Sequence, residues 1–469
     1  MRQENTVGSD VLDLDRKSVI HPFTDLRAHD AAESPARIIK RGQGIRVYDD
    51  AGAEFIDAFS GLYCVNIGYG RQEVADAIHA QAKELAYYHA YAGHGSAPAA
   101  ELSAKILSWY GPGMARVFYG LSGSDANETQ AKIVWYYNNV LGRPEKKKII
   151  SRLRGYHGAT VISGSMTGLP FYHKAFDLPC GPILHTTNPH HYFEAEPGMS
   201  EAEFSRKCAR DLEILIEREG PDTVAAFIGE PVLGTGGLIP PPEGYWDEIQ
   251  AVLKEHDILL IADEVICGFG RTGARFGSHL YGMKPDLITV AKGMTSGYLP
   301  LSGVIVSDQI WRVLKQGSDA FGVFSHGYTY TAHPLCAAAG VANLEILEKE
   351  RLVENARDTG AYFQAQMRLA FVDHPLVGEV RGVGLMGAIE FVADKKKKRR
   401  FDPDLKVGAR LAAACLERGL ISRAMPHGDI LGFAPPLILR PDDIDVIIEK
   451  LRRAIDQVTD ELRRSGDAY

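Results

Sequence analysis

Residues 258–273 read ILLIADEVICGFGRTG, and residues 287–293 read LITVAKG. Each begins with a nearly continuous aliphatic run, which is typical of a strand buried on both faces of a parallel sheet. The first run ends at Asp263 and the second at Lys292. Open α/β sheets bind ligands beyond the carboxyl ends of their strands. The two stretches therefore predict an α/β fold in which a carboxylate and an amine face one crevice.

Short, β-branched segments recur on both sides of these runs and alternate with amphipathic stretches. In Gln72–Tyr88, for example, Val74, Ile78 and Leu85 recur at helical spacing. The alternation predicts a doubly wound, mostly parallel sheet with helices on both faces. The expected strands are Val117–Tyr119, Lys148–Ser151, Val224–Ile228, Ile258–Ala262, Leu287–Ala291 and Gly303–Val306.

The last third of the chain has a different pattern. Long helical patterns dominate there, among them Leu352–Ala370 and Pro441–Arg464. Near the other end of the chain, Val47–Phe59 has the pattern of a β-hairpin, and we expect it to pack against the C-terminal part. The predicted domains are a large cofactor-binding domain over residues 69–334 and a small α+β domain made of residues 1–68 and 335–469.

Composition and charge exclude several classes of protein. The 469 residues carry 52 basic and 60 acidic side chains, a net charge of −8 with His neutral. Hydrophobic residues make up 45% and charged residues 24%, which is ordinary for a globular chain and excludes disorder, collagen and coiled coil as the main architecture. The acidic balance argues against nucleic acid as a partner.

The sequence also predicts no membrane, secretory or metal-binding segment. No apolar run approaches the ~18 residues of a membrane span, and the polar N-terminus lacks a secretory pattern. The six cysteines form no CxxC pair, which argues against a zinc site and a thioredoxin motif. We expect idle or buried thiols in a reducing cytoplasm.

Two motifs invite functional interpretations that their context does not support. Gly268, Gly270 and Gly273 match GxGxxG after a strand, which raises a Rossmann dinucleotide site as a hypothesis. No clean amphipathic helix follows, so we interpret the glycines as a loop. The basic run Lys395–Arg400 lies in a polar stretch between two structured patterns, which is typical of a solvated loop.

Asp263 and Lys292 each have an ordinary interpretation as well. The carboxylate could cap a helix or form a salt bridge, and the lysine could extend along the surface into water. A free lysine has a pKa of about 10.4 and is a poor nucleophile at neutral pH, but desolvation and imine formation change that. Their placement at the ends of two successive strands favours the functional interpretation.

Two further segments carry polar or aromatic groups at strand ends. Ser122, Gly123 and Ser124 precede a predicted helix, whose hydroxyls and free N–H groups would form an anion site, although such a triplet can be a simple cap. The segment RGYHGAT places Tyr156 and His157 between two glycines. An aromatic ring there could stack on a flat ligand, or it could simply pack on the surface.

Together these features match the needs of pyridoxal 5′-phosphate. Its aldehyde forms an imine with a lysine, its ring stacks on an aromatic side chain, and a carboxylate keeps its pyridine nitrogen protonated. Its phosphate suits a helix N-terminus. The sequence therefore predicts pyridoxal 5′-phosphate as the cofactor.

The sequence resembles the class III pyridoxal-phosphate aminotransferases of fold type I over nearly the whole chain. Within that class it is most similar to the amine– and β-amino acid–pyruvate aminotransferases, often called ω-transaminases. The most specific feature is DEV followed, 29 positions after its aspartate, by the lysine of AKG. The resemblance is carried by GLYCVNIGYG (61–70), SGSDANET (122–129), RGYHGAT (154–160), AAFIGEPV (225–232), LLIADEVICGFGRTG (259–273), ITVAKGMTSGYLP (288–300), HGYTYTAHPL (326–335), HPLVGEVRGVGLMGAIE (374–390) and ISRAMPHGDILGFAPPLI (421–438).

The resemblance implies a role for each matching residue. Lys292 would form the Schiff base and shuttle the proton, and Asp263 would pair with the pyridinium nitrogen. Val265 would pack on the ring face opposite Tyr156, and Glu230 would position the Asp263 side of the ring by hydrogen bonding. The other residues that the resemblance places at the cofactor are Ser122, Gly123, Ser124, His157, Tyr328 and Thr329.

The resemblance also implies a homodimer, because Thr329 and the backbone near Tyr328 would reach the phosphate of the neighbouring subunit. The residues that resemble the substrate pocket are Phe23, Tyr63, Tyr156 and Arg423. The chain departs from the family at two positions. Asp125 stands where Glu is frequent, and Tyr63 stands where amine-accepting relatives commonly have Trp. Tyrosine keeps that position aromatic and adds a hydroxyl.

We therefore expect a cytoplasmic aminotransferase that works by ping-pong half-reactions. It would move an amino group from a primary amine, diamine or β- or ω-amino acid to a keto acid, pyruvate. A same-fold decarboxylase, aminomutase or cyclising enzyme would keep Lys292 and Asp263 but release no alanine. The remaining alternative, a non-catalytic binding protein on this scaffold, is disfavoured by the presence of both residues.

Overall fold

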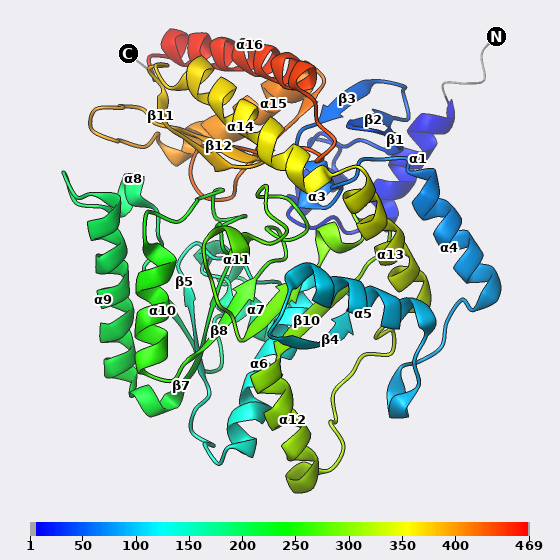
Figure 1. Cartoon of the computed structure of the whole chain (residues 1–469). Coiled ribbons are helices and arrows are strands. Elements are labelled where there is room, and N and C mark those ends of the chain that lie inside the picture. Colours follow the sequence, from blue (N-terminus) through cyan, green and yellow to red (C-terminus); the bar gives the residue numbers. More distant parts are fainter. Residues whose placement is uncertain (1–5, 468–469) are drawn as a thin grey trace.

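A central β-sheet organises the computed structural model, which describes residues 6–467 (Figure 1). Its strands follow the spatial order β4-β10-β9-β8-β7-β5-β6. β10 runs antiparallel to both of its neighbours, and the other pairs are parallel. The strands are β4 (Met114–Gly120), β5 (Lys148–Arg152), β6 (Ile183–Thr186), β7 (Val224–Gly229), β8 (Leu259–Asp263), β9 (Leu287–Val290) and β10 (Ser302–Ser307).

Both faces of this sheet are buried under helices. Ile150, Leu260 and Ile288 join the hydrophobic cluster under α5, α9 and α10, whereas their neighbours Ile149 and Ile261 join the cluster under α6, α7 and α12. This alternation follows from the two-residue period of a strand and confirms the predicted doubly wound α/β fold. The covering helices are α5 (Ala97–Tyr110), α6 (Gly123–Val140), α7 (Val161–Met166), α9 (Glu201–Glu219), α10 (Tyr245–Glu255) and α12 (Asp308–Phe321).

The predicted strands are all present, with ends that differ by at most three residues. The sequence pattern missed β6, because its two central residues are only half-buried and give no continuous apolar run. Helix α4 (Gln72–Glu84) ends four residues before the predicted Tyr88. Leu85 already has an extended backbone, and Tyr87 and Tyr88 are exposed, so no packing supports a further helical turn.

A four-stranded sheet joins the two ends of the chain. The predicted hairpin is confirmed as β2 paired with β3, and Ile56 of β3 pairs in parallel with Leu420 of β13. A second four-stranded sheet has the order β11-β12-β15-β14. The strands of the two sheets are β1 (Ile39–Gln43), β2 (Arg46–Asp49), β3 (Glu54–Asp57), β13 (Leu420–Ile421), β11 (Val377–Val383), β12 (Met386–Phe391), β14 (Arg423–Ala424) and β15 (Ile430–Phe433).

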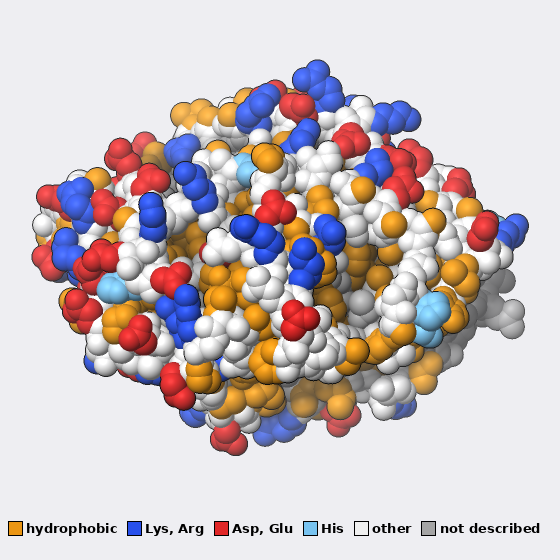
Figure 2. Space-filling model, turned by 60° about the horizontal axis from the view of Figure 1, so that its bottom comes forward, with side chains coloured by type: hydrophobic (Ala, Val, Ile, Leu, Met, Phe, Trp, Pro, Cys, Tyr) orange, Lys and Arg blue, Asp and Glu red, His pale blue; other side chains and the backbone are white. Residues whose placement is uncertain are grey.

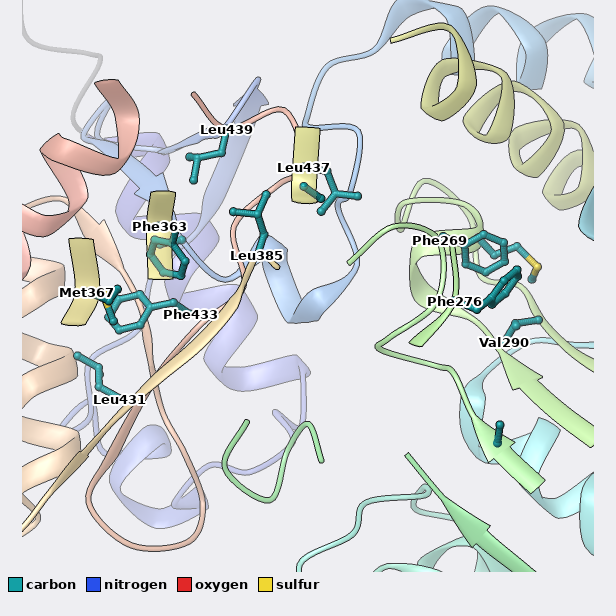
Figure 3. Packing of buried hydrophobic residues seen from close by; sticks show 14 of the residues in the cluster. Phe269, Phe276, Val290, Phe363, Met367, Leu385, Leu431, Phe433, Leu437 and Leu439 are labelled. Carbon is teal, nitrogen blue, oxygen red and sulfur yellow. The ribbon is translucent and has the colours of Figure 1, made fainter. Parts of the chain in front are cut away.

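Figure 3 shows two parts of the core, one beside the central sheet and one in the C-terminal part. Phe269 and Phe276 lie close together near Val290 of β9, while Phe363 of α14 packs by Phe433 of β15. All belong to one hydrophobic cluster. The predicted domain division, 69–334 against the rest, stays a prediction. The remaining helices are α1 (Thr6–Ser18), α2 (Leu26–Asp30), α3 (Ser60–Tyr63), α8 (His191–Glu194), α11 (Gly277–Leu280), α13 (Pro334–Lys349), α14 (Leu352–Phe371), α15 (Val407–Glu417) and α16 (Pro441–Ser465).

Both loop interpretations from the sequence are confirmed. Residues 264–276 form turns rather than a helix, so the GxGxxG match is not a dinucleotide motif in structure. The basic run Lys395–Arg400 lies mostly exposed in a turn after β12, which is closed by a bridge between Asp394 and Arg399. None of the described helices has the length and apolar content needed to cross a membrane. The six cysteines form no disulfide.

Candidate active site

A cavity of about 400 Å³ opens at the carboxyl ends of the central strands. Lys292 reaches it from β9 and Asp263 from β8, while Leu121 borders it from β4. The structure thus brings together nine of the residues predicted to bind a cofactor, which are Ser122, Gly123, Ser124, Tyr156, His157, Glu230, Asp263, Val265 and Lys292.

Lys292 lies directly after β9, at the start of the 3₁₀ turn η4 (Lys292–Met294). Its backbone φ is +43°, in the left-handed region that a non-glycine residue keeps only when its surroundings hold it there. The side chain is half-buried. Burial lowers the pKa of its amine, and the nearby Cys64, Asp263 and Glu230 oppose that lowering. A lowered pKa makes the neutral amine more abundant, which a nucleophile or a base requires.

Asp263 ends β8 and is only 2% exposed. Its Oδ1 accepts a hydrogen bond from the backbone N–H of Val265 at 3.1 Å. Its Oδ2 accepts from the Asn127 side-chain amide and from His157 Nδ1, each at 2.8 Å. Because a buried carboxylate without donors would be costly, these three contacts satisfy the Asp263 side chain and fix its orientation.

A row of hydrogen bonds extends behind Asn127. The Gln130 amide donates to Thr289 Oγ1 at 3.1 Å, and the Thr289 hydroxyl donates to Asn127 Oδ1 at 2.6 Å. Each donor points toward Asp263, and bonds in such a row polarise one another. Our sequence analysis missed all three residues. The only available signal was the spacing of Asn127 and Gln130, which places them on one face of α6.

His157 contacts Asp263 through its Nδ1 atom, 2.8 Å from Asp263 Oδ2. A carboxylate only accepts hydrogen bonds, so opposite a carboxylate at Asp263 the donor of this bond is His157 Nδ1. The other ring nitrogen, Nε2, is buried and has no hydrogen-bond partner within residues 6–467. His157 belongs to the cavity lining and contacts Asp263 from there.

Among the residues that the structure describes, the start of α6 leaves backbone N–H groups without acceptors beside the cavity. Ser122 caps the helix by accepting from the N–H of Asp125. The backbone N–H groups of Gly123 and Ser124 have no acceptor in the described part of the chain. Gly158 has a φ of +143°, and a Cβ there would lie 2.8 Å from Ser124 Cα, so a glycine is needed for this close approach. Free N–H groups at the positive end of a helix dipole bind anions.

Tyr156 and Val265 contribute the less polar part of the lining. Val265 packs against α6, since a Cβ on Gly123 would lie 3.0 Å from Val265 Cγ2. The N–H of Tyr156 donates to Glu230 Oε2 at 3.3 Å, and burial raises the pKa of the Tyr156 hydroxyl. The placement of these two side chains on opposite faces of a cofactor ring stays a prediction.

Glu230 is buried beside them. Burial raises the pKa of its carboxyl, which accepts from the N–H of Gly234 at 2.9 Å. The Arg152 guanidinium lies 4.0 Å away. Within the described residues Glu230 makes no hydrogen bond to Asp263, so its predicted action on that side of the ring would have to be exerted through a bound group.

Three of the predicted substrate residues lie outside this lining. Tyr63 is 1% exposed, and its hydroxyl is directed at the sulfur of Met425, 3.9 Å away. The Arg423 guanidinium lies over the ring of Phe59, 5.6 Å from its centroid. Phe23 is 71% exposed. The hydroxyl at position 63 is therefore satisfied within the protein rather than presented to the cavity.

Phe23 is nevertheless connected to the cavity through an aromatic residue that our sequence analysis missed. Tyr172 packs edge-on against Phe23 with centroids 5.1 Å apart, and its ring lies 5.5 Å from that of Tyr156. Burial raises the pKa of Tyr172 to about 12, although the charge of Arg423 opposes the rise. Tyr172 thus joins Phe23, Tyr156 and Arg423 into one aromatic and cationic region.

Tyr328 and Thr329 also lie outside the cavity lining. The Tyr328 hydroxyl donates to the backbone carbonyl of Asp125 at 3.0 Å, at the start of α6. The carbonyl of Thr329 accepts from the hydroxyl of Tyr87 at 2.6 Å. Their predicted contact with the phosphate of a neighbouring subunit stays a prediction.

A buried charged cluster lies apart from the cavity, where the large sheet meets β11 and β12. His190 Nε2 and the Arg381 guanidinium both donate to Glu379, at 3.0 and 2.6 Å. Arg381 also donates to Glu390 at 2.9 Å, and Arg154 donates to His190 Nδ1 at 2.8 Å. His190, Glu379 and Glu390 have the spacing of metal ligands, but Arg381 already forms an ion pair with each of the two carboxylates.

A family description, aminotransferase class-III, matches residues 28–455. The chain belongs to the class III aminotransferases. This settles the fold type and the class of reaction that the sequence resemblance implied, and it leaves a non-catalytic scaffold without support.

Among curated relatives, this class III aminotransferase is 61% identical over 463 residues to the diaminobutyrate–2-oxoglutarate transaminase of Halomonas elongata, covering 98% of this chain and 99% of the relative. It is 42% identical over 454 residues to the gamma aminobutyrate transaminase 1 of Solanum lycopersicum, covering 96% and 87%. Among solved structures, it matches the omega transaminase from Pseudomonas jessenii in complex with PMP with a TM-score of 0.93, at 43% identity over 96% of this chain and 98% of the other.

Class III aminotransferases use pyridoxal phosphate, and the residues of this cavity fit that group. The free N–H groups of α6 suit a phosphate. The buried carboxylate of Asp263, oriented by three hydrogen-bond partners, suits a protonated ring nitrogen. The half-buried amine of Lys292, with its lowered pKa, suits an aldehyde.

Proposed function

We propose that this aminotransferase moves an amino group from a primary amine, diamine or β- or ω-amino acid to pyruvate, with pyridoxal phosphate bound at Lys292. One observation carries the proposal: the Lys292 amine, the Asp263 carboxylate and the free N–H groups of α6 line a single cavity. The names of the relatives support the class of donor, because diaminobutyrate and gamma aminobutyrate both carry an amino group away from the carboxylate.

When bound, pyridoxal phosphate supplies an aldehyde that accepts the amino group and a ring that withdraws electrons from the reacting carbon. Lys292 accepts and returns the proton at Nζ, since burial lowers its pKa and so favours the neutral amine. Asp263 binds the protonated ring nitrogen and keeps it protonated. Gly123 and Ser124 bind the phosphate through their N–H groups.

Arg423 is the residue we assign to the carboxylate of the acceptor. Its charge acts on both Tyr156 and Tyr172, where it opposes the rise in pKa that burial causes. A guanidinium matches one carboxylate in a planar, bidentate contact. One such group favours the monocarboxylate pyruvate over 2-oxoglutarate, the dicarboxylate in the name of the Halomonas relative.

A donor screen tests the proposal. Purified enzyme with added cofactor is incubated with pyruvate and a panel of diamines, ω-amino acids, α-amino acids and arylalkylamines, and alanine is measured. We expect alanine from the ω-amino donors and none from Lys292→Ala. A parallel series with 2-oxoglutarate reports glutamate, and glutamate without alanine would contradict the choice of pyruvate. Carbon dioxide release without either product would indicate the decarboxylase alternative.

We further propose a cytoplasmic homodimer in which Thr329 reaches the phosphate of the neighbouring site. Exposed aromatic residues beside Thr329 support this arrangement: Tyr87 donates to the Thr329 carbonyl, the rings of Tyr87 and Tyr330 lie 5.7 Å apart, and Tyr88 is exposed as well. Figure 2 shows one face of the molecule on which hydrophobic side chains form patches between charged ones. Exposed apolar patches of this kind mark protein interfaces.

A further inference from the structure

The turn that carries Lys292 has an unusual backbone. Lys292 has a φ of +43° and Ser296 a φ of +49°, and neither is a glycine. Within the turn, the N–H of Met294 donates to the carbonyl of Ala291 at 2.9 Å, whereas the next bond, from Thr295 to Lys292, is long at 3.3 Å. The turn therefore depends on groups outside itself to keep Lys292 in the left-handed region.

Asn343 supplies those groups from α13. It is 0% exposed, and its Nδ2 donates to the carbonyls of Gly293 and Met294, each at 2.9 Å. Its Oδ1 accepts from the hydroxyl of Ser296 at 2.6 Å. One buried amide thus forms hydrogen bonds to three residues of this segment, Gly293, Met294 and Ser296, and uses both of its N–H donors there.

Asn66, from the N-terminal part of the chain, packs against the same turn. A Cβ on Gly293 would lie 2.4 Å from Asn66 Nδ2, so the two residues are in close contact. The Asn66 amide is fixed in turn, because it donates to the carbonyl of Phe269 at 3.0 Å and accepts from the Arg271 guanidinium at 2.7 Å. Arg271 is fully buried, and burial lowers its pKa to about 10.

We propose that Asn343 is a positioning residue that holds the turn in its left-handed conformation and so directs the Lys292 amine into the cavity. Asn343 does not line the cavity, so it acts only through the turn. Misplacement of a reacting group by about 1 Å can cost on the order of 100-fold in rate. The inference rests on the proposed role of Lys292.

The test uses the full-length protein and pyridoxal phosphate as the probe. Asn343→Leu removes both donors and the acceptor at similar volume. The rate at which the cofactor-free protein captures pyridoxal phosphate on Lys292 is followed by visible absorbance, and the site is confirmed by borohydride reduction and peptide mass spectrometry. We expect capture and kcat to fall about tenfold or more, with the KM for the amine changing less than threefold.

Asn138→Leu is the matched control. Asn138 is 1% exposed and donates to the carbonyl of Val134 within its own helix, α6. We expect this control to lower the melting temperature without slowing capture. Ser296→Ala removes only the hydroxyl that donates to Asn343 and should slow capture about threefold. This variant provides the test if Asn343→Leu does not fold.

Two outcomes would overturn the inference. One is a wild-type capture rate in Asn343→Leu, or in Ser296→Ala where only that variant folds. The other is an equal slowing in Asn138→Leu, which would mean that lost stability alone explains the effect. If the wild-type protein itself captures no cofactor on Lys292, the proposed function fails first, and the two failures are thereby distinguished.

Discussion

Two of the three hydrogen-bond donors to the Asp263 carboxylate, Asn127 and His157, come from distant parts of the chain. An uncharged amide in place of this carboxylate could not keep a ring nitrogen protonated. We therefore expect Asp263→Asn to slow single-turnover amino transfer by ~10²-fold or more, comparable with the loss of a well-placed electrostatic group. Stopped-flow absorbance measures this rate. Thr289→Val, which breaks the row of hydrogen bonds behind Asn127, should give a smaller loss, and unchanged rates in both variants would make Asp263 a structural residue.

Arg423 permits a test that separates the two substrates. It lies on the short strand β14, and no carboxylate of the described residues forms an ion pair with it. Loss of a charge-assisted contact of ~1.5–3 kcal/mol should raise the KM for pyruvate roughly 10- to 100-fold in Arg423→Ala. The half-reaction with an uncharged arylalkylamine should change little, because that donor has no carboxylate to bind. Equal damage to both half-reactions would point to a structural role.

Single residues could be predicted where the chain places them at the end of a strong strand pattern. Lys292 and Asp263 follow aliphatic runs, so the sheet itself determines that they meet. Asn127 and Thr289 are bonded across 162 positions, and no local pattern indicates that contact. Tyr172 was missed for the same reason, because its neighbours Phe23 and Tyr156 come from separate segments.

At the scale of elements, the charged cluster that joins β11 and β12 to the large sheet should make stability depend on pH. Burial lowers the pKa of His190 from 6.5 to about 4. Burial alone would raise the pKa of Glu379, but Arg381 and His190 outweigh it and lower it to about 2. Both folded pKa values lie below the unfolded ones, so the unfolded chain binds more protons and acid favours unfolding.

We expect the free energy of unfolding to fall as the pH drops from about 6.5 to 4, with roughly 3 kcal/mol of the loss due to His190. A further loss, from Glu379, follows below about pH 4.5. Urea unfolding at a series of pH values measures both. In His190→Gln the free energy of unfolding should change less steeply with pH between pH 6.5 and 4. The difference from the wild type measures the contribution of His190 apart from that of the other buried histidines. An unchanged slope would show that this ring titrates normally.

The elements themselves were predictable to different degrees. Strands of the central sheet are buried on both faces, so their aliphatic runs stand out in the sequence. β13 and β14 are only two residues long, too short for any periodic signal. The turn at Lys292 was not predictable as a strained element, because its left-handed residues are a lysine and a serine rather than glycines.

At the scale of the whole molecule, the proposed dimer links assembly to the cofactor. A ligand that bridges two chains stabilises the bridged state. Sedimentation velocity with and without excess pyridoxal phosphate measures this. A wild-type protein that is monomeric and fully active at low concentration would contradict the arrangement.

The pairing of Ile56 with Leu420 has a consequence for how the protein is made. The two partners are separated by 364 positions, since 420 − 56 = 364. At ~5–20 residues per second, a ribosome needs roughly 20 to 70 seconds after completing β3 to produce β13. Throughout that interval the edge of β3 has no partner, and an unpaired edge readily joins another nascent chain. Translation speed and chaperone supply should therefore govern the soluble yield, and chains that terminate before residue 420 should aggregate rather than accumulate as a folded large domain.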